Sequence, residues 1–237
     1  MTTSTLTIAK REFGAYFKSP IAYIVLTVFL ALTGFFFFDH FFVAGNASMV
    51  AFFANMPLIL LFFGPAIAMR LLAEERGSGT IELLLTMPVR DWEVVVGKYL
   101  AAVGLLAVGL ALTLPFAITV GKLGPLDKGP VIGGYVGTLF LGGTYLAIGL
   151  FASAMTKNQI VAFIVGLAIC FILFLMGRAI DAVPESVGKL LEYMSPQFHF
   201  DGVTRGVVEL RNLVYYLSVI GVVLLLTVQV LESRKWR

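Results

Sequence analysis

The amino-acid sequence predicts an all-α integral membrane protein with six transmembrane helices and both termini in the cytoplasm. Two features of the composition support this fold class. Hydrophobic residues make up 59% of the chain and charged residues only 13%, about half the share found in soluble domains. The apolar residues also form long continuous blocks, whereas a surface helix of a soluble protein carries them along one stripe.

Six apolar blocks are long enough to span a bilayer. A transmembrane helix needs about 20 mostly apolar residues to cross about 30 Å of hydrocarbon, and a longer block tilts. Pro57, Pro65 and Pro115 fall inside such blocks and are expected to kink them, because proline removes a backbone hydrogen bond. We predict spans over residues 21–38, 50–69, 99–120, 131–155, 160–177 and 213–231.

The basic residues predict the orientation of these spans. With both termini inside, the inner segments hold 11 of the 17 Lys and Arg residues, and the outer segments hold 6 that neighbouring Asp and Glu offset. The inner set is Lys10, Arg11, Lys18, Arg70, Arg76, Arg90, Lys98, Lys157, Arg234, Lys235 and Arg237. The outer set is Lys122, Lys128, Arg178, Lys189, Arg205 and Arg211. Because cytoplasmic loops are enriched in Lys and Arg, we place both termini and residues 73–98 in the cytoplasm.

Residues 4–19 precede the first span and predict an interfacial helix. The segment mixes three basic residues with apolar ones, namely Leu6, Ile8, Phe13, Tyr16 and Phe17. A helix of this composition lies in the headgroup plane of the bilayer; the alternative is a flexible tail. Pro20 marks the corner into the first span, since proline is tolerated at a helix start.

Residues 178–212 form the longest outer segment. An amphipathic stripe runs through Val187, Leu190, Leu191 and Met194, with the spacing of a helix. Two structures fit this pattern equally well. One is a pair of interfacial helices that dip into the outer leaflet, and the other is a surface segment that lies on the spans.

Small residues in the fourth span predict close helix contacts. Gly133 and Gly137 are four residues apart, as are Gly149 and Ser153. Pairs of small residues at this spacing allow two transmembrane backbones to approach each other.

Catalytic and nucleotide-binding motifs are missing from the sequence. The Gly-Lys pairs are followed by Tyr or Leu, whereas a phosphate-binding loop needs Ser or Thr there. If the protein uses ATP, another chain must bind the nucleotide and its magnesium. We expect no cofactor on this chain, no metal and no nucleic acid, since the basic residues form no stripe. Asp39-His40 and the pair His199 and Asp201 on the outer side lack ligand spacing and are interpreted as interfacial polar residues.

Residues 73–88 interrupt the apolar sequence between the second and third spans. The stretch "AEERGSGTIELLLTMP" is too short and too polar to cross the membrane. Gly77 and Gly79 allow a turn, Glu82 suits the first turn of a helix, and Pro88 ends it. We predict a short, partly apolar helix below the bilayer that docks into a groove on a cytosolic partner. The alternative is a loop that folds back onto the lipid.

The stretch "EERGSGTIELLLTMPVRDWEVVVGK" resembles the coupling-helix signature of permease subunits of type 2 ABC transporters. The matching positions are Glu75, Gly79, Thr80, Glu82, Leu83, Leu84, Pro88, Gly97 and Lys98. The stretches "AKREFGAYFKSPIAYIVL" and "SPQFHFDGVTRGVVELRNLVYY" further resemble the subset that includes the gliding-motility and nitrous-oxide-maturation permeases. Together these stretches cover about a third of the chain.

The resemblance implies a transmembrane subunit of an ATP-driven exporter in the bacterial cytoplasmic (inner) membrane. Such a permease pairs with a second copy or a sister permease within the lipid bilayer and binds two cytosolic ABC ATPase subunits. Some members also work with a membrane protein that carries a large extracytoplasmic domain. The residues expected to couple the chain to the ATPase are Glu74, Glu75, Arg76, Gly77, Gly79, Thr80, Ile81, Glu82, Leu83, Leu84, Leu85, Pro88 and Lys98.

Two alternative functions remain at this point. The chain could be a membrane anchor or scaffold of a larger envelope machine, with no transport of its own. It could also be an extracytoplasmic metal- or haem-handling membrane protein that uses the outer His and Asp residues, which the absence of ligand spacing disfavours.

Overall fold

The structure is a computed structural model that describes residues 2–44, 49–80, 89–124, 126–204, 206 and 209–233. Within these ranges the chain is helical, without strands. Six segments of the described part are long and apolar enough to cross a membrane, which confirms the predicted all-α class with six candidate spans. They are Pro20–Asp39, Met56–Gly77, Asp91–Leu123, Lys128–Met155, Gln159–Ala179 and Leu210–Glu232. The cytoplasmic location of both termini stays a prediction.

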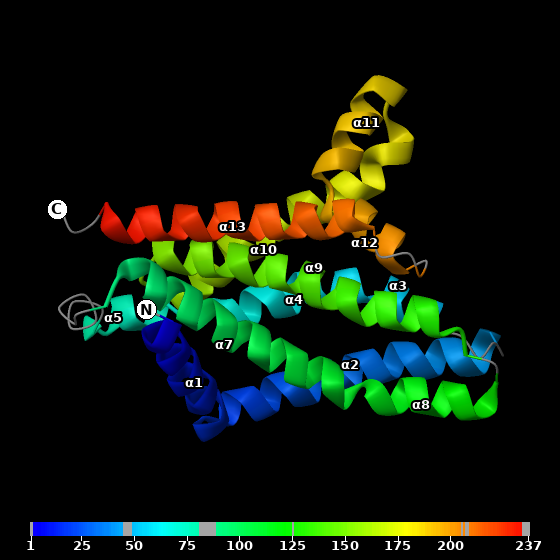
Figure 1. The fold of residues 1–237 in the computed structure, drawn as a ribbon, viewed down its shortest axis with the longest axis horizontal. Coiled ribbons are helices and arrows are strands. Elements are labelled where there is room, and N and C mark those ends of the chain that lie inside the picture. The colour runs from blue at the N-terminus through cyan, green and yellow to red at the C-terminus, as the bar shows by residue number, and fades with distance from the viewer. Residues whose placement is uncertain are drawn as a thin grey trace.

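The long helices form a bundle whose axes follow the long direction of the molecule (Figure 1). The main helices of the spans are α2 (Pro20–Ala44), α4 (Met56–Ala68), α7 (Asp91–Leu112), α8 (Leu114–Leu123), α9 (Lys128–Met155), α10 (Gln159–Ala179) and α13 (Leu210–Glu232), and the short α3 (Val50–Ala54) precedes α4. The start of α1 (Thr2–Lys18), α5 (Ala73–Gly77) and the end of α13 lie at one end of the bundle, here called the α5 end. The opposite end, called the α12 end, carries α3, α8 and α12 (Pro196–Thr204).

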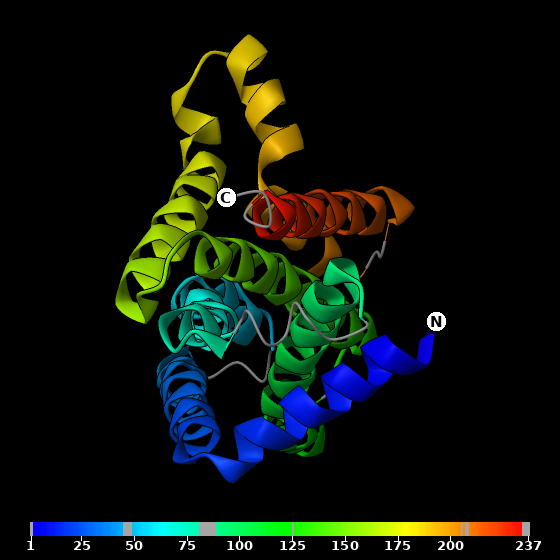
Figure 2. The ribbon, with the colours of Figure 1, turned by 90° about the vertical axis from the view of Figure 1, so that its left-hand side faces the viewer.

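Helix α9 forms the centre of the bundle (Figure 2). It contacts α4, α7, α10, α12 and α13, and 78% of its most apolar 18-residue stretch is buried inside the protein. Glycines make this central position possible. A Cβ atom on Gly64 of α4 would lie 2.6 Å from the Cβ atom of Tyr145, and one on Gly149 would lie 3.0 Å from the Cα atom of Pro65. The backbones of α4 and α9 therefore touch directly, as in other close-packed transmembrane pairs.

The second and third spans are each divided near a proline. The predicted second span, residues 50–69, breaks at Asn55, two residues before Pro57, so that the span of the structure begins at Met56. The third span breaks at Thr113, two residues before Pro115. Proline lacks the N–H that would continue the helical hydrogen bonds, and its ring clashes with the preceding turn. Pro65 remains inside α4. The third span also begins at Asp91, whereas the sequence predicted a start at residue 99.

Helix α1 runs across the α5 end of the bundle and packs against α7 (Figure 2). A Cβ atom on Gly97 would lie 2.7 Å from Cγ2 of Ile8, and one on Gly104 would lie 3.1 Å from the ring of Phe13. The segment predicted as an interfacial helix is therefore helical, and one of its faces is covered by α7.

The segment between α10 and α13 contains a 3₁₀ turn (Ile180–Ala182), α11 (Glu185–Met194) and α12. Helix α12 lies on α9, where Phe200 and Val203 are buried. Helix α11 projects from the bundle (Figures 1 and 2), and its Leu190 is 60% exposed. Helix α12 therefore lies on the spans, as in the second alternative, whereas α11 stands away from them.

Candidate functional site

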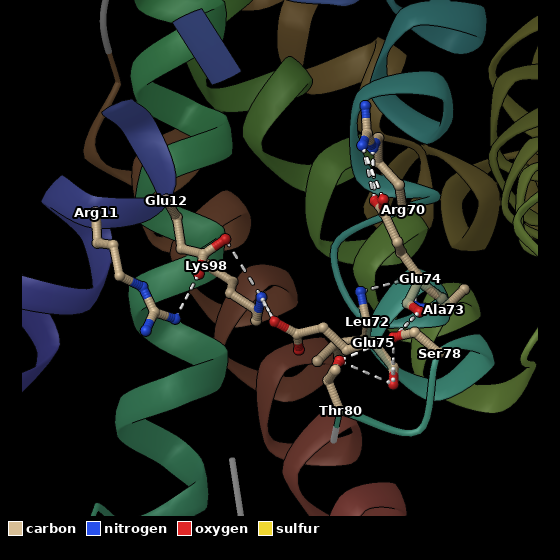
Figure 3. A network of polar contacts seen from close by, with 11 residues as sticks. Arg11, Glu12, Arg70, Leu72, Ala73, Glu74, Glu75, Ser78, Thr80 and Lys98 are labelled. Atoms are coloured by element: carbon tan, nitrogen blue, oxygen red, sulfur yellow. Dashed lines mark hydrogen bonds and ion pairs between the residues drawn. The ribbon is translucent and has the colours of Figure 1, made fainter. Parts of the chain in front are cut away.

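Three helices meet at a buried charge near the α5 end of the bundle (Figure 3). Lys98 of α7 is only 1% exposed. Its Nζ atom lies 2.7 Å from Oε1 of Glu75 in α5 and 3.4 Å from Oε2 of Glu12 in α1. One ammonium group therefore links the N-terminal helix, the short helix after span two and the start of span three. We call these three residues the Lys98 hub.

The neighbouring cations of the Lys98 hub favour the ionised form of Glu12. Burial raises the pKa of the Glu12 carboxyl, but the nearby Lys98 ammonium and the Arg11 guanidinium outweigh burial, and the pKa lies below its ordinary value. Arg11 contacts Glu12 at 2.8 Å. A buried cation without partners is costly, so removing either carboxylate would leave part of this cost uncompensated.

Ser153 of α9 fixes the turn between α4 and α5. Its Oγ atom accepts hydrogen bonds from the backbone N–H of Leu72 at 3.1 Å and of Ala73 at 2.9 Å. The same hydroxyl donates to the carbonyl oxygen of Met69 at 2.8 Å. These groups belong to the end of one helix and the start of the next, where backbone groups lack helical partners. One side chain thereby ties the start of α5 to the central helix.

Arg76 adds a second tie between α5 and α9. Its side chain is 6% exposed, and its Nη1 atom donates to the carbonyl oxygen of Ala154. Gly77 follows, where a Cβ atom would lie 2.9 Å from the carbonyl oxygen of Lys157. Arg76 therefore points into the protein and does not lie on an outer docking surface.

The other described residues of this segment lie near the surface. The Arg70 guanidinium donates to the Glu74 carboxylate at 2.9 and 3.1 Å. Gly79 has a φ of +76°, which favours glycine, and Thr80 follows it with an exposed side chain. Its hydroxyl lies 2.9 Å from that of Ser78. A cleft of about 400 Å³ separates α1 from α5 beside these residues and reaches Lys98.

Six predicted coupling residues lie outside the described residues: Ile81, Glu82, Leu83, Leu84, Leu85 and Pro88. Of the predicted residues that are described, Glu75 and Lys98 are in direct contact, although they are 23 positions apart. Glu12 joins this contact, and sequence reasoning missed it. The one available signal was an acidic residue among the basic ones in "AKREFGAYFK".

The predicted packing residues of α9 all lie at helix contacts. A Cβ atom on Gly133 would lie 2.3 Å from the carbonyl oxygen of Val203, and one on Gly137 would lie 3.3 Å from the side chain of Phe200. Gly149 meets Pro65 and Ala68 of α4 and lies near Gly166 of α10. Ser153, predicted as a small packing residue, uses its hydroxyl instead.

His199 of α12 is part of a buried hydrogen-bonded network. It is 2% exposed, and its Nδ1 atom lies 2.7 Å from Oδ1 of Asn212. Its ring stacks on Tyr215 with 3.9 Å between the ring centroids. Within the described ranges, no group of three His, Cys, Asp or Glu residues is placed to hold a metal ion. The side chain of His40 lies outside the description.

Comparison with known proteins assigns the family. A family model described as "ABC-2 family transporter protein" matches residues 6–235, which is nearly the whole chain. No curated protein matches the chain. Members of this family are transmembrane permease components that associate with an ABC ATPase, and the six spans agree with this. The chain therefore belongs to the ABC-2 transporter family and is a multi-pass membrane protein.

Proposed function

We propose that the chain is the transmembrane subunit of an ATP-driven exporter and that residues 73–88 couple it to ATP hydrolysis on a separate ATPase subunit. The observation that carries this proposal is the Lys98 hub together with the two ties of α5 to α9. Through Glu75, Arg76 and the turn held by Ser153, the segment after span two contacts α7 and α9, and the Lys98 ammonium links it to Glu12 of α1. A displacement of residues 73–80 by a partner would therefore reach three other helices at once.

The proposal assigns different roles to the predicted coupling residues. Residues 81–88 form the surface that enters a groove on the ATPase, with Glu82 facing polar or basic groups there. Arg76, Glu75 and Lys98 transmit the displacement and position the segment. This division rests on the burial of Arg76 and Lys98, which leaves neither side chain accessible to a partner in the described arrangement.

The proposal also includes the assembly. Two copies, or one copy and a sister permease, form the path across the bacterial inner membrane, and two cytosolic ATPase subunits bind below them. ATP and magnesium bind to those subunits. As in the gliding-motility and nitrous-oxide-maturation subset, a membrane protein with a large extracytoplasmic domain joins the complex. The outward faces of α2, α10 and α13 are available for pairing or for contact with lipid, since only 28%, 22% and 17% of their most apolar 18-residue stretches are buried inside the protein.

The coupling experiment compares the purified complex of the wild type with a variant that carries Leu84→Ala and Glu82→Lys. We expect the variant to insert in the membrane but to lose the ATPase subunit or its stimulated hydrolysis. Leu123→Ala is the matched control, because Leu123 is 63% exposed on α8, outside residues 73–88 and outside the faces of α2, α10 and α13. Retention of both the complex and its activity in the double variant would favour a membrane anchor or scaffold.

Topology is tested separately by single cysteines. Ser78 is exposed at the α5 end, and Lys189 is exposed on α11 at the opposite side of the predicted membrane. A membrane-impermeant thiol reagent applied to intact cells should label Lys189→Cys and spare Ser78→Cys. Labelling of position 78 would overturn the cytoplasmic location of the coupling segment.

A further inference from the structure

A groove between α1 and α7 lies on another part of the α5 end. Its volume is about 310 Å³. Apart from one lysine, the residues that line it are apolar or small: Leu6, Ala9, Lys10, Phe13, Leu100, Ala101 and Gly104. The Lys98 hub does not contribute to this groove, and the transport proposal gives it no role.

Small residues of α7 lie where this helix contacts α1, at the inner side of the groove. Ala101 is 1% exposed, and a Cβ atom on Gly104 would lie 3.1 Å from the Phe13 ring. Larger side chains stand at the rim, where Leu6 is 69% exposed and Leu100 is 42% exposed. Exposed leucines beside an apolar groove are unfavourable in water, so this surface is suited to a hydrocarbon chain.

The charge at the groove comes from Lys10. Its neighbour Arg11 contacts Glu12, and Glu12 in turn contacts Lys98. Lys10 makes no ion pair within the described ranges, and its side chain is exposed. The groove therefore combines an apolar lining with one cation, Lys10, that has no ion-pair partner within the described ranges.

We propose that this groove binds one acyl chain of an anionic phospholipid, with the lipid phosphate next to the Lys10 ammonium. The ligand needs an apolar tail and a negative group at one end, and a phospholipid of the bilayer has both. The volume falls within the range of about 300–1,000 Å³ that small-molecule sites occupy. The inference requires α1 to lie at the bilayer surface but requires no ATPase, so it goes beyond the transport function.

Binding of this lipid would hold α1 against α7. Because Glu12 of α1 belongs to the Lys98 hub, an occupied groove would also favour the contact between Glu12 and Lys98. Lipid composition would then influence the same junction that the coupling segment uses.

Native mass spectrometry of the purified full chain tests the proposal. The protein is titrated with phosphatidylglycerol and with phosphatidylcholine of identical acyl chains, and the ratio of the two affinities is measured. We expect the wild type to prefer phosphatidylglycerol. Lys10→Gln should lower this preference about fivefold, as expected for one cation near an anionic headgroup. Lys18→Gln is the matched control, since Lys18 is exposed on the same helix but does not line the groove.

A competition with glycerol phosphate separates a lipid site from a simple phosphate site. The soluble headgroup lacks an acyl chain and should not displace phosphatidylglycerol. Four results would each overturn the proposal: no preference in the wild type, an unchanged preference in Lys10→Gln, an equal loss in Lys18→Gln, or displacement by glycerol phosphate. Both substitutions are at exposed positions, and circular dichroism of each variant checks that the helices are retained.

Discussion

The two ends of the bundle are held together by different kinds of contact. At the α5 end, the Lys98 ammonium contacts two carboxylates that come from α1 and α5. At the α12 end, neutral groups bond to backbone carbonyls: Tyr215 donates to the oxygen of Met194 and Tyr216 to that of Pro196, both at 2.6 Å. His199 adds its contact with Asn212.

This difference indicates which end can change its arrangement. The attraction between charges falls off slowly with distance, so a lysine can retain an interaction with either of two carboxylates while the helices shift. A short hydrogen bond from a phenol weakens steeply when its geometry is lost. The contacts of the Lys98 hub can therefore adjust, whereas those of Tyr215 and Tyr216 require a fixed geometry, which fits the proposal that a partner acts on the α5 end.

The strongest test of the comparison removes the cation. Lys98→Met leaves the Glu75 carboxylate without its counter-ion and leaves Glu12 with Arg11 alone, and we expect a loss of about 3–5 kcal/mol in stability. Thermal unfolding in detergent measures the effect. Lys98→Arg should recover part of the loss because it keeps the charge. An unchanged melting temperature in Lys98→Met would show that the hub contributes nothing to the α5 end.

A second test concerns the turn that Ser153 holds. Ser153→Ala removes the acceptor of the Leu72 and Ala73 N–H groups and should cost about 1–3 kcal/mol, since buried donors would lose their partner. Ser218→Ala is the control, because the exposed Ser218 hydroxyl donates only to Val214 of its own helix. Hydrogen exchange at residues 72 and 73 should rise in the first variant alone. Equal melting temperatures for the two variants would rule out this role.

A third test weakens the α12 end. Tyr216→Phe removes a buried hydrogen bond to the Pro196 carbonyl, and we expect a loss of about 1 kcal/mol. Tyr23→Phe, at a position that is 57% exposed, should have no effect on the melting temperature. If the α12 end is the fixed one, Tyr216→Phe should leave the pH dependence of stability unchanged.

The smallest expected effect is that of acid. The pKa of Glu12 is lower in the folded protein than its ordinary value of about 4.3. The stabilisation from Glu12 is therefore fully present above that value and is lost as the pH falls through the lower, folded-state pKa. Melting curves at falling pH should show this loss, and Glu12→Gln should reduce it. A pH profile identical to that of the wild type would contradict the assignment.

The spans could be predicted from the sequence because each one depends only on a continuous local stretch of apolar residues. A continuous apolar block has to satisfy its backbone within a helix when lipid surrounds it, whatever the rest of the fold does. The breaks at Asn55 and Thr113 were harder to predict. Proline marks both regions, yet Pro65 remains within α4, so the residue type alone does not decide where a span divides.

The Lys98 hub could be predicted only in part. The sequence indicated that Glu75 and Lys98 matter, but it treated both as surface residues of a docking segment. Their contact depends on the way α5 turns back toward α7, and Glu12 arrives from a helix at the start of the chain. Contacts of this kind depend on tertiary packing, which hydropathy and local spacing do not encode. The burial of Arg76 was unexpected for the same reason.

The central position of α9 has a consequence for the insertion of the chain during synthesis. Of the six candidate spans, α9 has the lowest mean hydropathy and the largest buried share, so it enters lipid least readily by itself. Its glycine contacts include Gly64 with Tyr145 and Gly142 with Leu106, on α4 and α7. Both helices precede α9 in the sequence and leave the ribosome first. The order of synthesis therefore supplies the least apolar span with partners that are already in the membrane when it emerges.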